Sequence, residues 1–198
     1  YNTGLGPQSI VGYKMALWKS ADLIHWQDMG TPYSLEDGIW YQARRQQFQK
    51  DDKSNWRLWA PEIQFWDDRW VIVHTSPSPV AGANLSVTLS KEFRGPFANP
   101  LGEQINKRHD PSLFCDTDRT LWMVYGATKV IQIKSDLSGF EGSPADIGPS
   151  NRKIGHEGCL IRKIGSHYVL FGTGWSTDQG RHGTYNLYYC TAPNVTGP

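Results

Sequence analysis

Long hydrophobic runs, an excess of one charge and low-complexity segments are all missing from this sequence of 198 residues. No apolar stretch approaches the about 18 residues that a membrane-spanning helix needs, so we expect no membrane span. The net charge of +1 argues against a general partner for nucleic acids or acidic membranes. These absences leave a folded domain with a core of its own.

Cysteine is also scarce. The three cysteines, Cys115, Cys159 and Cys190, have no metal-ligand spacing, and their odd number leaves at least one unpaired within the chain. Because cysteine is often buried, we expect buried thiols. The cysteines therefore indicate no metal site, and we assign no metal ligands and no cofactor from the sequence.

Aromatic residues and turn formers are abundant. Nine Trp and nine Tyr suit ring stacking as well as core packing. Twenty Gly and twelve Pro indicate many turns, which an all-β fold of short strands requires.

A four-residue pattern recurs at positions 60, 110 and 157. Each copy is followed by a polar turn and then by an apolar run rich in aromatic residues, such as Trp70–His74. A repeat of this period, made of short strands, is typical of propellers and solenoids. The copies are Ala60–Ile63, Asp110–Leu113 and Glu157–Leu160.

We predict an all-β fold, a β-propeller of four-stranded blades, in a single domain over residues 1–198. A Ser or Thr before a polar turn, as at Ser90 and Thr191, is expected to end each fourth strand. The opening residues resemble the end of a second strand, so the sequence is expected to begin inside a blade and the ring to be incomplete. The predicted segments are part of the first blade at 1–30, a loop at 31–55, and blades at about 56–100, 105–150 and 154–198.

Two carboxylates share the repeated position. If the blades surround one centre, Asp110 and Glu157 face each other across one pocket. Paired carboxylates in a pocket indicate acid–base chemistry, and a neighbouring charge raises the pKa of the partner that must stay protonated.

Four motifs of this sequence resemble motifs of glycoside hydrolase family 43, and they occur in the same order as in that family. They are Ser20–Trp26, Trp59–Ile63, His109–Phe114 and His156–Leu160. The resemblance implies a five-bladed propeller that hydrolyses furanosides or pyranosides of plant polysaccharides with inversion. It also implies that Glu157 is the general acid and that Asp110 orients this acid. The family's base, an Asp, is expected roughly 15 to 20 residues before Tyr1, and no residue of this chain matches it.

The same resemblance leaves the sugar open. Arabinofuranosidase, xylosidase and arabinanase activities on arabinose- or xylose-containing substrates all fit, and we expect a secreted or periplasmic protein. Self-association that completes the ring and a central calcium ion, for which no ligands are assigned, both stay open. The alternatives are a non-catalytic carbohydrate-binding propeller that lacks the base, and a five-bladed relative from a neighbouring glycosidase family.

Five residues are candidates for contact with the sugar. Trp59 directly precedes a repeated position, and His109 and His156 flank the two acids. Trp175 and Arg181 lie in or beside a loop that reaches the pocket rim on this interpretation. The alternatives are core packing for Trp59, capping of the core for Trp175 and, for Arg181, a loop that does not reach the pocket rim.

Overall fold

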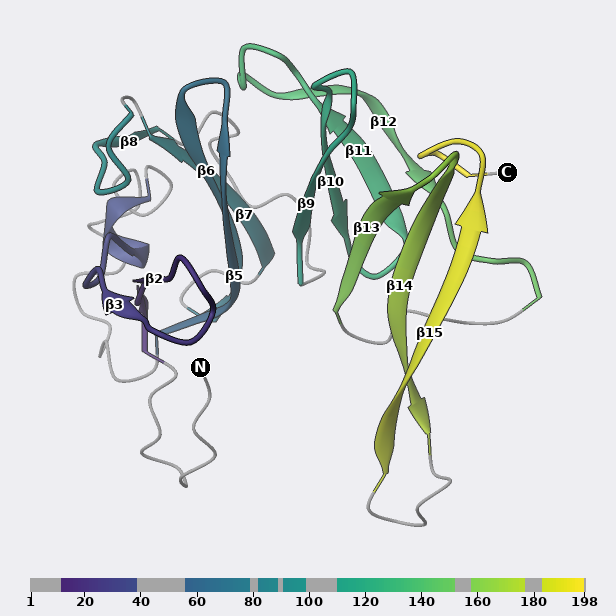
Figure 1. The fold of residues 1–198 in the computed structure, drawn as a ribbon, viewed down its shortest axis with the longest axis horizontal. Coiled ribbons are helices and arrows are strands. Elements are labelled where there is room, and N and C mark those ends of the chain that lie inside the picture. The colour runs from purple at the N-terminus through teal and green to yellow at the C-terminus, as the bar shows by residue number, and fades with distance from the viewer. Residues whose placement is uncertain are drawn as a thin grey trace. The chain divides into compact units, whose positions relative to one another are not determined.

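The structure, a computed structural model, describes residues 12–38, 56–78, 82–88, 91–98, 110–151, 158–176 and 183–197. Over these residues it consists of strands and turns with one 3-10 helix, η1 (Leu35–Asp37). The chain divides into two compact units, Tyr1–Ile105 and Asn106–Pro198, whose elements are labelled in Figure 1. No helix among the described residues is long and apolar enough to cross a membrane.

The first unit begins with an antiparallel hairpin. β1 pairs with β4 and β2 pairs with β3. Between the two pairs, the Leu17 N–H donates to the Gly30 carbonyl and the Met29 N–H donates to the Leu17 carbonyl. The prediction of a loop over residues 31–55 is wrong at its start, because Tyr33 and Ser34 form β4 and Tyr33 is fully buried. A strand of two residues is too short to show an alternating pattern in the sequence. The four strands are β1 (Lys14–Met15), β2 (Trp18–Lys19), β3 (Gln27–Asp28) and β4 (Tyr33–Ser34).

The connection between β2 and β3 is held by its own side chains. Ser20 Oγ accepts the backbone N–H of Leu23 at 2.8 Å, and the Asp22 carboxylate accepts the N–H of His25 and contacts its Nδ1 at 2.7 Å. The bonds from His25 hold the pKa of Asp22 well below its usual range. The first motif of the resemblance thus builds a turn.

A four-stranded antiparallel sheet completes the first unit, in the order β5-β6-β7-β8. Its β6 strand contributes Ile72 to a buried cluster with Met15, Tyr33 and Trp56, so the hairpin and the sheet share one core. The strands are β5 (Arg57–Trp66), β6 (Arg69–Ser78), β7 (Gly82–Thr88) and β8 (Phe97–Ala98).

The second unit contains two antiparallel sheets, β9 to β12 and β13 to β15, each paired in chain order. Their facing sides form one core in which Phe114 and Val124 of the first sheet pack with Ile161 and Leu170 of the second. The strands are β9 (Ser112–Cys115), β10 (Leu121–Tyr125), β11 (Lys129–Ile133), β12 (Phe140–Asp146), β13 (Cys159–Ile164), β14 (His167–Ser176) and β15 (Thr184–Ala192).

The two complete sheets are four-stranded meanders, as predicted for blades, but the prediction for the strand ends is wrong. Thr88 ends β7 and Ile133 ends β11, which are third strands. The fourth strands begin after the glycine turns, at Phe97 and Phe140. The short β8 and the largely exposed β12 carry no apolar alternation that would reveal them.

None of the three cysteines forms a disulfide. Cys159 is buried in the core of the second unit, and burial raises the pKa of the half-buried Cys190. Cys115 is exposed at the end of β9, which corrects the expectation that all three are buried.

Candidate functional site

The repeated sequence position has a repeated backbone conformation. Ala60 has φ 44° and Asp110 has φ 56°, both in the left-handed region that non-glycine residues seldom occupy. In β5 the pairing register with β6 shifts between Trp59 and Glu62, as in a β-bulge. Aspartate tolerates this conformation better than most residues, so Asp110 suits its place just before β9.

The Asp110 side chain reaches the next sheet of its unit. Its Oδ2 accepts a hydrogen bond from the backbone N–H of Gly158, with a donor–acceptor distance of 2.9 Å. That nitrogen belongs to the peptide bond that joins Glu157 to Gly158. The bond therefore links the second copy of the repeat to the third and fixes the Asp110 carboxylate at the start of β13.

Gly158 is the residue of this contact that the sequence interpretation missed. It has φ 64°, and a Cβ built on it would meet no atom within 4 Å. Its glycine is thus explained by backbone conformation and not by crowding. A glycine directly after the acidic residue of the third copy is consistent with this backbone conformation, but it does not indicate the hydrogen bond.

The other predicted site residues fall into two groups. Trp59 in β5 is 44% exposed and Trp175 in β14 is 52% exposed, so neither side chain is buried in a hydrophobic core. Four residues lie outside the described residues, and their roles stay predictions. They are Glu157, His109, His156 and Arg181.

A polar cluster joins the opposite ends of β9 and β13. Lys163 Nζ donates to Asp116 Oδ1 at 3.0 Å and to Tyr168 Oη at 2.9 Å, and Tyr168 Oη donates to Asp116 Oδ2. Burial opposes ionisation of Asp116, but the hydrogen bonds from Tyr168, the Thr117 N–H and Lys163 outweigh it and lower the pKa of this carboxyl. The strands are thus tied at both ends, by Asp110 at one and Asp116 at the other.

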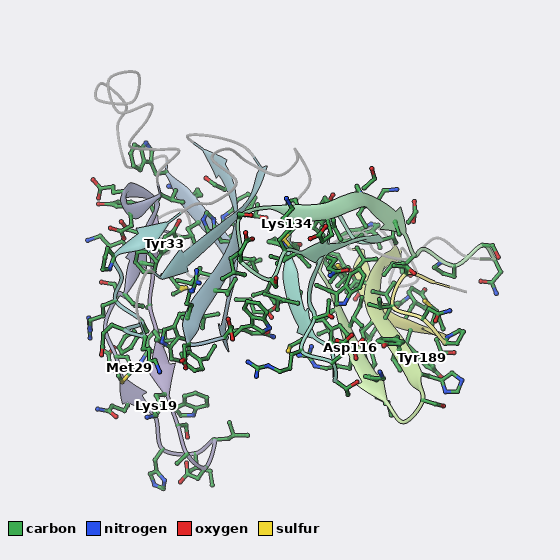
Figure 2. All side chains as sticks on the ribbon, turned by 90° about the horizontal axis from the view of Figure 1, so that it is seen from above. Lys19, Met29, Tyr33, Asp116, Lys134 and Tyr189 are labelled. Carbon is green, nitrogen blue, oxygen red and sulfur yellow. The ribbon has the colours of Figure 1, made fainter. Side chains whose placement is uncertain are left out.

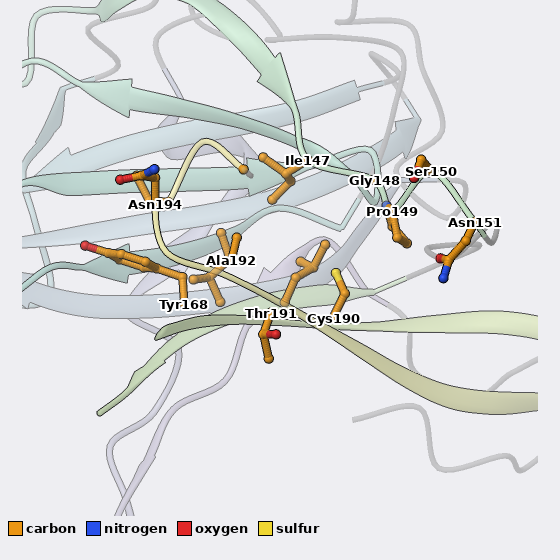
Figure 3. A pocket seen from close by; sticks show the side chains of 14 residues that line it. Ile147, Gly148, Pro149, Ser150, Asn151, Tyr168, Cys190, Thr191, Ala192 and Asn194 are labelled. Carbon is orange, nitrogen blue, oxygen red and sulfur yellow. The ribbon is translucent and has the colours of Figure 1, made fainter. Parts of the chain in front are cut away.

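A pocket of about 350 Å³ lies elsewhere in the second unit (Figure 3). Ile147, Tyr168 and Ala192 are among its lining residues, and Asp110 and Gly158 are not. Tyr168 pairs with Ala192 near the turn that follows β13, whereas Gly158 precedes that strand. The pocket is therefore separate from the Asp110 contact.

No group of three or more His, Cys, Asp or Glu side chains within the described ranges could hold a metal ion. A fixed carboxylate such as that of Asp110 can orient a neighbouring acid and influence its protonation.

Comparison with known proteins places these features in context. A family model described as glycosyl hydrolases family 43 matches residues 8–198. An endo-arabinase from Bacteroides thetaiotaomicron VPI-5482 superposes with a TM-score of 0.70 at 19% identity, covering 94% of this chain and 70% of that one. An α-L-arabinofuranosidase from Clostridium thermocellum ATCC 27405 gives 0.66 at 18%, covering 99% and 62%.

A structure described as endo-1,4-beta-xylanase from Bacteroides thetaiotaomicron VPI-5482 is similar to the same degree, with a TM-score of 0.66 and 19% identity over 96% of this chain and 63% of that one. No curated protein matches the chain significantly. The chain spans between 40% and 70% of the length of the first solved structures that it resembles. At these identities the likenesses show the fold, so the predicted all-β class of propeller type is confirmed.

Proposed function

Since the chain belongs to glycoside hydrolase family 43, as the match over residues 8–198 shows, we propose that the protein hydrolyses arabinose- or xylose-containing plant polysaccharides or oligosaccharides. The activities to be assayed are those of an α-L-arabinofuranosidase, a β-xylosidase and an arabinanase. Names of the similar solved structures, which include an endo-arabinase and an α-L-arabinofuranosidase, support this range. Polysaccharides of this kind lie outside cells, so we also propose a secreted or periplasmic location.

The proposed chemistry is acid-assisted cleavage of an acetal with inversion. An acid protonates the leaving oxygen, while a base activates water on the opposite face of the sugar. We assign the acid to Glu157 and assign Asp110 to orienting it. No residue of this chain is assigned as the base.

The observation that carries this proposal is the hydrogen bond from the Gly158 N–H to Asp110 Oδ2 at 2.9 Å. It fixes a carboxylate beside the peptide bond that follows Glu157. A negative charge near a carboxylic acid disfavours its ionisation, so the proposed role of Asp110 is to keep the proton of Glu157 available. Trp59, with its exposed ring, is proposed to contact the sugar, as are His109, His156 and Arg181.

The direct experiment is to follow hydrolysis of arabinan and arabinoxylan by the full-length protein with proton NMR. We expect the first anomer released to have the configuration opposite to that of the cleaved linkage. Release with retained configuration would contradict the inverting mechanism. Binding of these polysaccharides without any hydrolysis would instead favour the non-catalytic carbohydrate-binding propeller.

A further inference from the structure

The hairpin of β14 and β15 is longer than the sheet to which it belongs. β13 contains 6 residues, whereas β14 contains 10 and β15 contains 9. Pairing between β13 and β14 stops at Cys159 and Gly172, but pairing between β14 and β15 continues to Ser176 and Thr184. The last part of the hairpin thus extends beyond β13, as Figure 1 shows.

This extension lies past the end of β13 at which the Asp110 carboxylate is held. Gly158 directly precedes Cys159, and Cys159 pairs with Gly172. Trp175 is three residues beyond Gly172 on β14, which corresponds to about 10 Å along the strand from the level of Cys159. The extension therefore leaves the sheet on the side of the candidate site.

An aromatic pair stands on one face of the extension. Trp175 and Tyr185 are cross-strand partners, and their rings meet edge to face with centroids 5.0 Å apart. Both remain exposed, at 52% and 45%. The sequence predicts a sugar contact for Trp175 but does not identify Tyr185.

The orientation of the indole ring depends on the residue just before the return strand β15. A Cβ added to Gly183 would lie 2.0 Å from Cζ2 of Trp175, so the ring occupies the space that a side chain would take. On the opposite face the Tyr188 ring covers Gly174, where a Cβ would lie 2.6 Å from Cε2. Two glycines thus allow rings to pack against both faces of this hairpin.

The exposed face continues along β15. Leu187 is 72% exposed and Tyr189 is 71% exposed, and Tyr189 lies at the margin of the second unit (Figure 2). Exposed apolar side chains gathered on one face are a feature of interaction sites. Rigid Trp and Tyr rings offer an apolar surface with polar atoms at one edge, which matches the C–H faces and hydroxyl rims of sugar rings.

We propose that Trp175 and Tyr185 form a stacking platform for sugar units of a chain substrate, remote from the bond that is cleaved. This inference rests on the proposed function for its choice of ligand, because the extension lies on the side of the Asp110 contact. A platform at that distance favours oligosaccharides and polysaccharides over substrates with a single sugar. Gly183 is a positioning residue, since it sets the orientation of the Trp175 ring.

The test is calorimetric binding of arabinohexaose and xylohexaose to the full-length protein and to its Trp175→Ala, Tyr185→Ala and Gly183→Ala variants. Loss of a ring contact is expected to weaken binding of the preferred hexasaccharide about 3- to 10-fold. Gly183→Ala should weaken it although every ring is retained. Tyr189→Ala, on the same face but level with the interior of the sheet, is the matched control and should change binding less.

Kinetics and circular dichroism separate the possible outcomes. In Trp175→Ala, KM should rise more for the hexasaccharide than for an aryl glycoside with one sugar, while circular dichroism remains that of a folded β protein. Hexasaccharide hydrolysis with unchanged affinity in all three variants would overturn the platform but leave the hydrolase proposal intact. Weakened hexasaccharide binding in a protein that hydrolyses nothing would support the platform without the hydrolase. An equal loss in Tyr189→Ala would overturn it in favour of a face that packs against protein.

Discussion

The Asp110 carboxylate accepts a hydrogen bond from the backbone N–H of Gly158 at 2.9 Å, although 48 positions separate the two residues. It thereby joins the loop before β9 to the start of β13, which are the places of two repeated motifs. The contact gives the motifs a physical relation that their spacing only suggested. Its consequences can be measured in the full-length protein.

The first prediction concerns the charge of Asp110. Asparagine tolerates the left-handed conformation and offers an oxygen to the Gly158 N–H, so Asp110→Asn should fold normally. Because the substitution removes a negative charge beside the proposed acid, the alkaline limb of the pH–rate profile should move to lower pH. Measurement of kcat/KM against pH tests this. An alkaline limb that does not move would reject the role of Asp110 in raising the pKa of Glu157.

A second prediction concerns His74, which is fully buried in β6 and has Tyr33 Oη 3.2 Å from its Nε2. Burial lowers the pKa of His74 to about 4 from its ordinary value of 6.5. Between these values the unfolded chain binds a proton that the folded chain does not, so stability falls as pH falls. The free energy of unfolding should drop by roughly 2 kcal/mol between about pH 7 and about pH 5.

Urea unfolding of the wild type and of His74→Gln at both pH values measures this effect. Glutamine does not titrate, so the variant should lose less stability over the same interval. Identical pH dependence in the two proteins would show that His74 is not buried as a neutral ring.

A third prediction concerns the polar cluster at the far ends of β9 and β13. Tyr168→Phe removes the hydroxyl that donates to the nearly buried Asp116 carboxylate. A hydrogen bond to a charged group of this kind contributes about 1.5–3 kcal/mol, so urea unfolding should show a loss of that order. Tyr189→Phe removes a hydroxyl from an exposed side chain and should cost less than about 0.5 kcal/mol.

The pH dependence of this cluster has a definite sign. The pKa of Asp116 is lowered from its ordinary value of 3.8, so its ionised form stabilises the fold above that pH and the contribution disappears as pH falls. The difference between the wild type and Tyr168→Phe should therefore shrink in acid. Equal stability losses in the two Tyr→Phe variants at neutral pH would contradict a structural role for the cluster.

The sequence could predict the strands that carry the repeats, because their short apolar runs follow each motif at similar spacing. Fourth strands such as β8 could not be recognised, since two residues show no period. The left-handed backbone conformation of Ala60 could not be predicted either, because alanine has no preference for that conformation. It arises from the shifted register between β5 and β6.

The sequence could predict Asp110 as a site residue, but it could not predict the hydrogen bond from the Gly158 N–H. A hydrogen bond from a backbone N–H depends on how two sheets pack, and no side chain marks the donor. Tyr185 had a readable signal, since Tyr185, Leu187 and Tyr189 alternate as in a strand with one apolar face. That alternation alone could not show that the apolar face is exposed.

The most direct test of the central claim is the effect of Glu157→Gln on leaving groups in the full-length protein. We expect hydrolysis of arabinan or arabinoxylan to fall by about 10²- to 10⁴-fold, since general acid catalysis contributes that much. Hydrolysis of an aryl glycoside, whose leaving oxygen needs little protonation, should fall much less. Equal losses on both kinds of substrate would contradict the assignment of Glu157 as the acid that Asp110 orients.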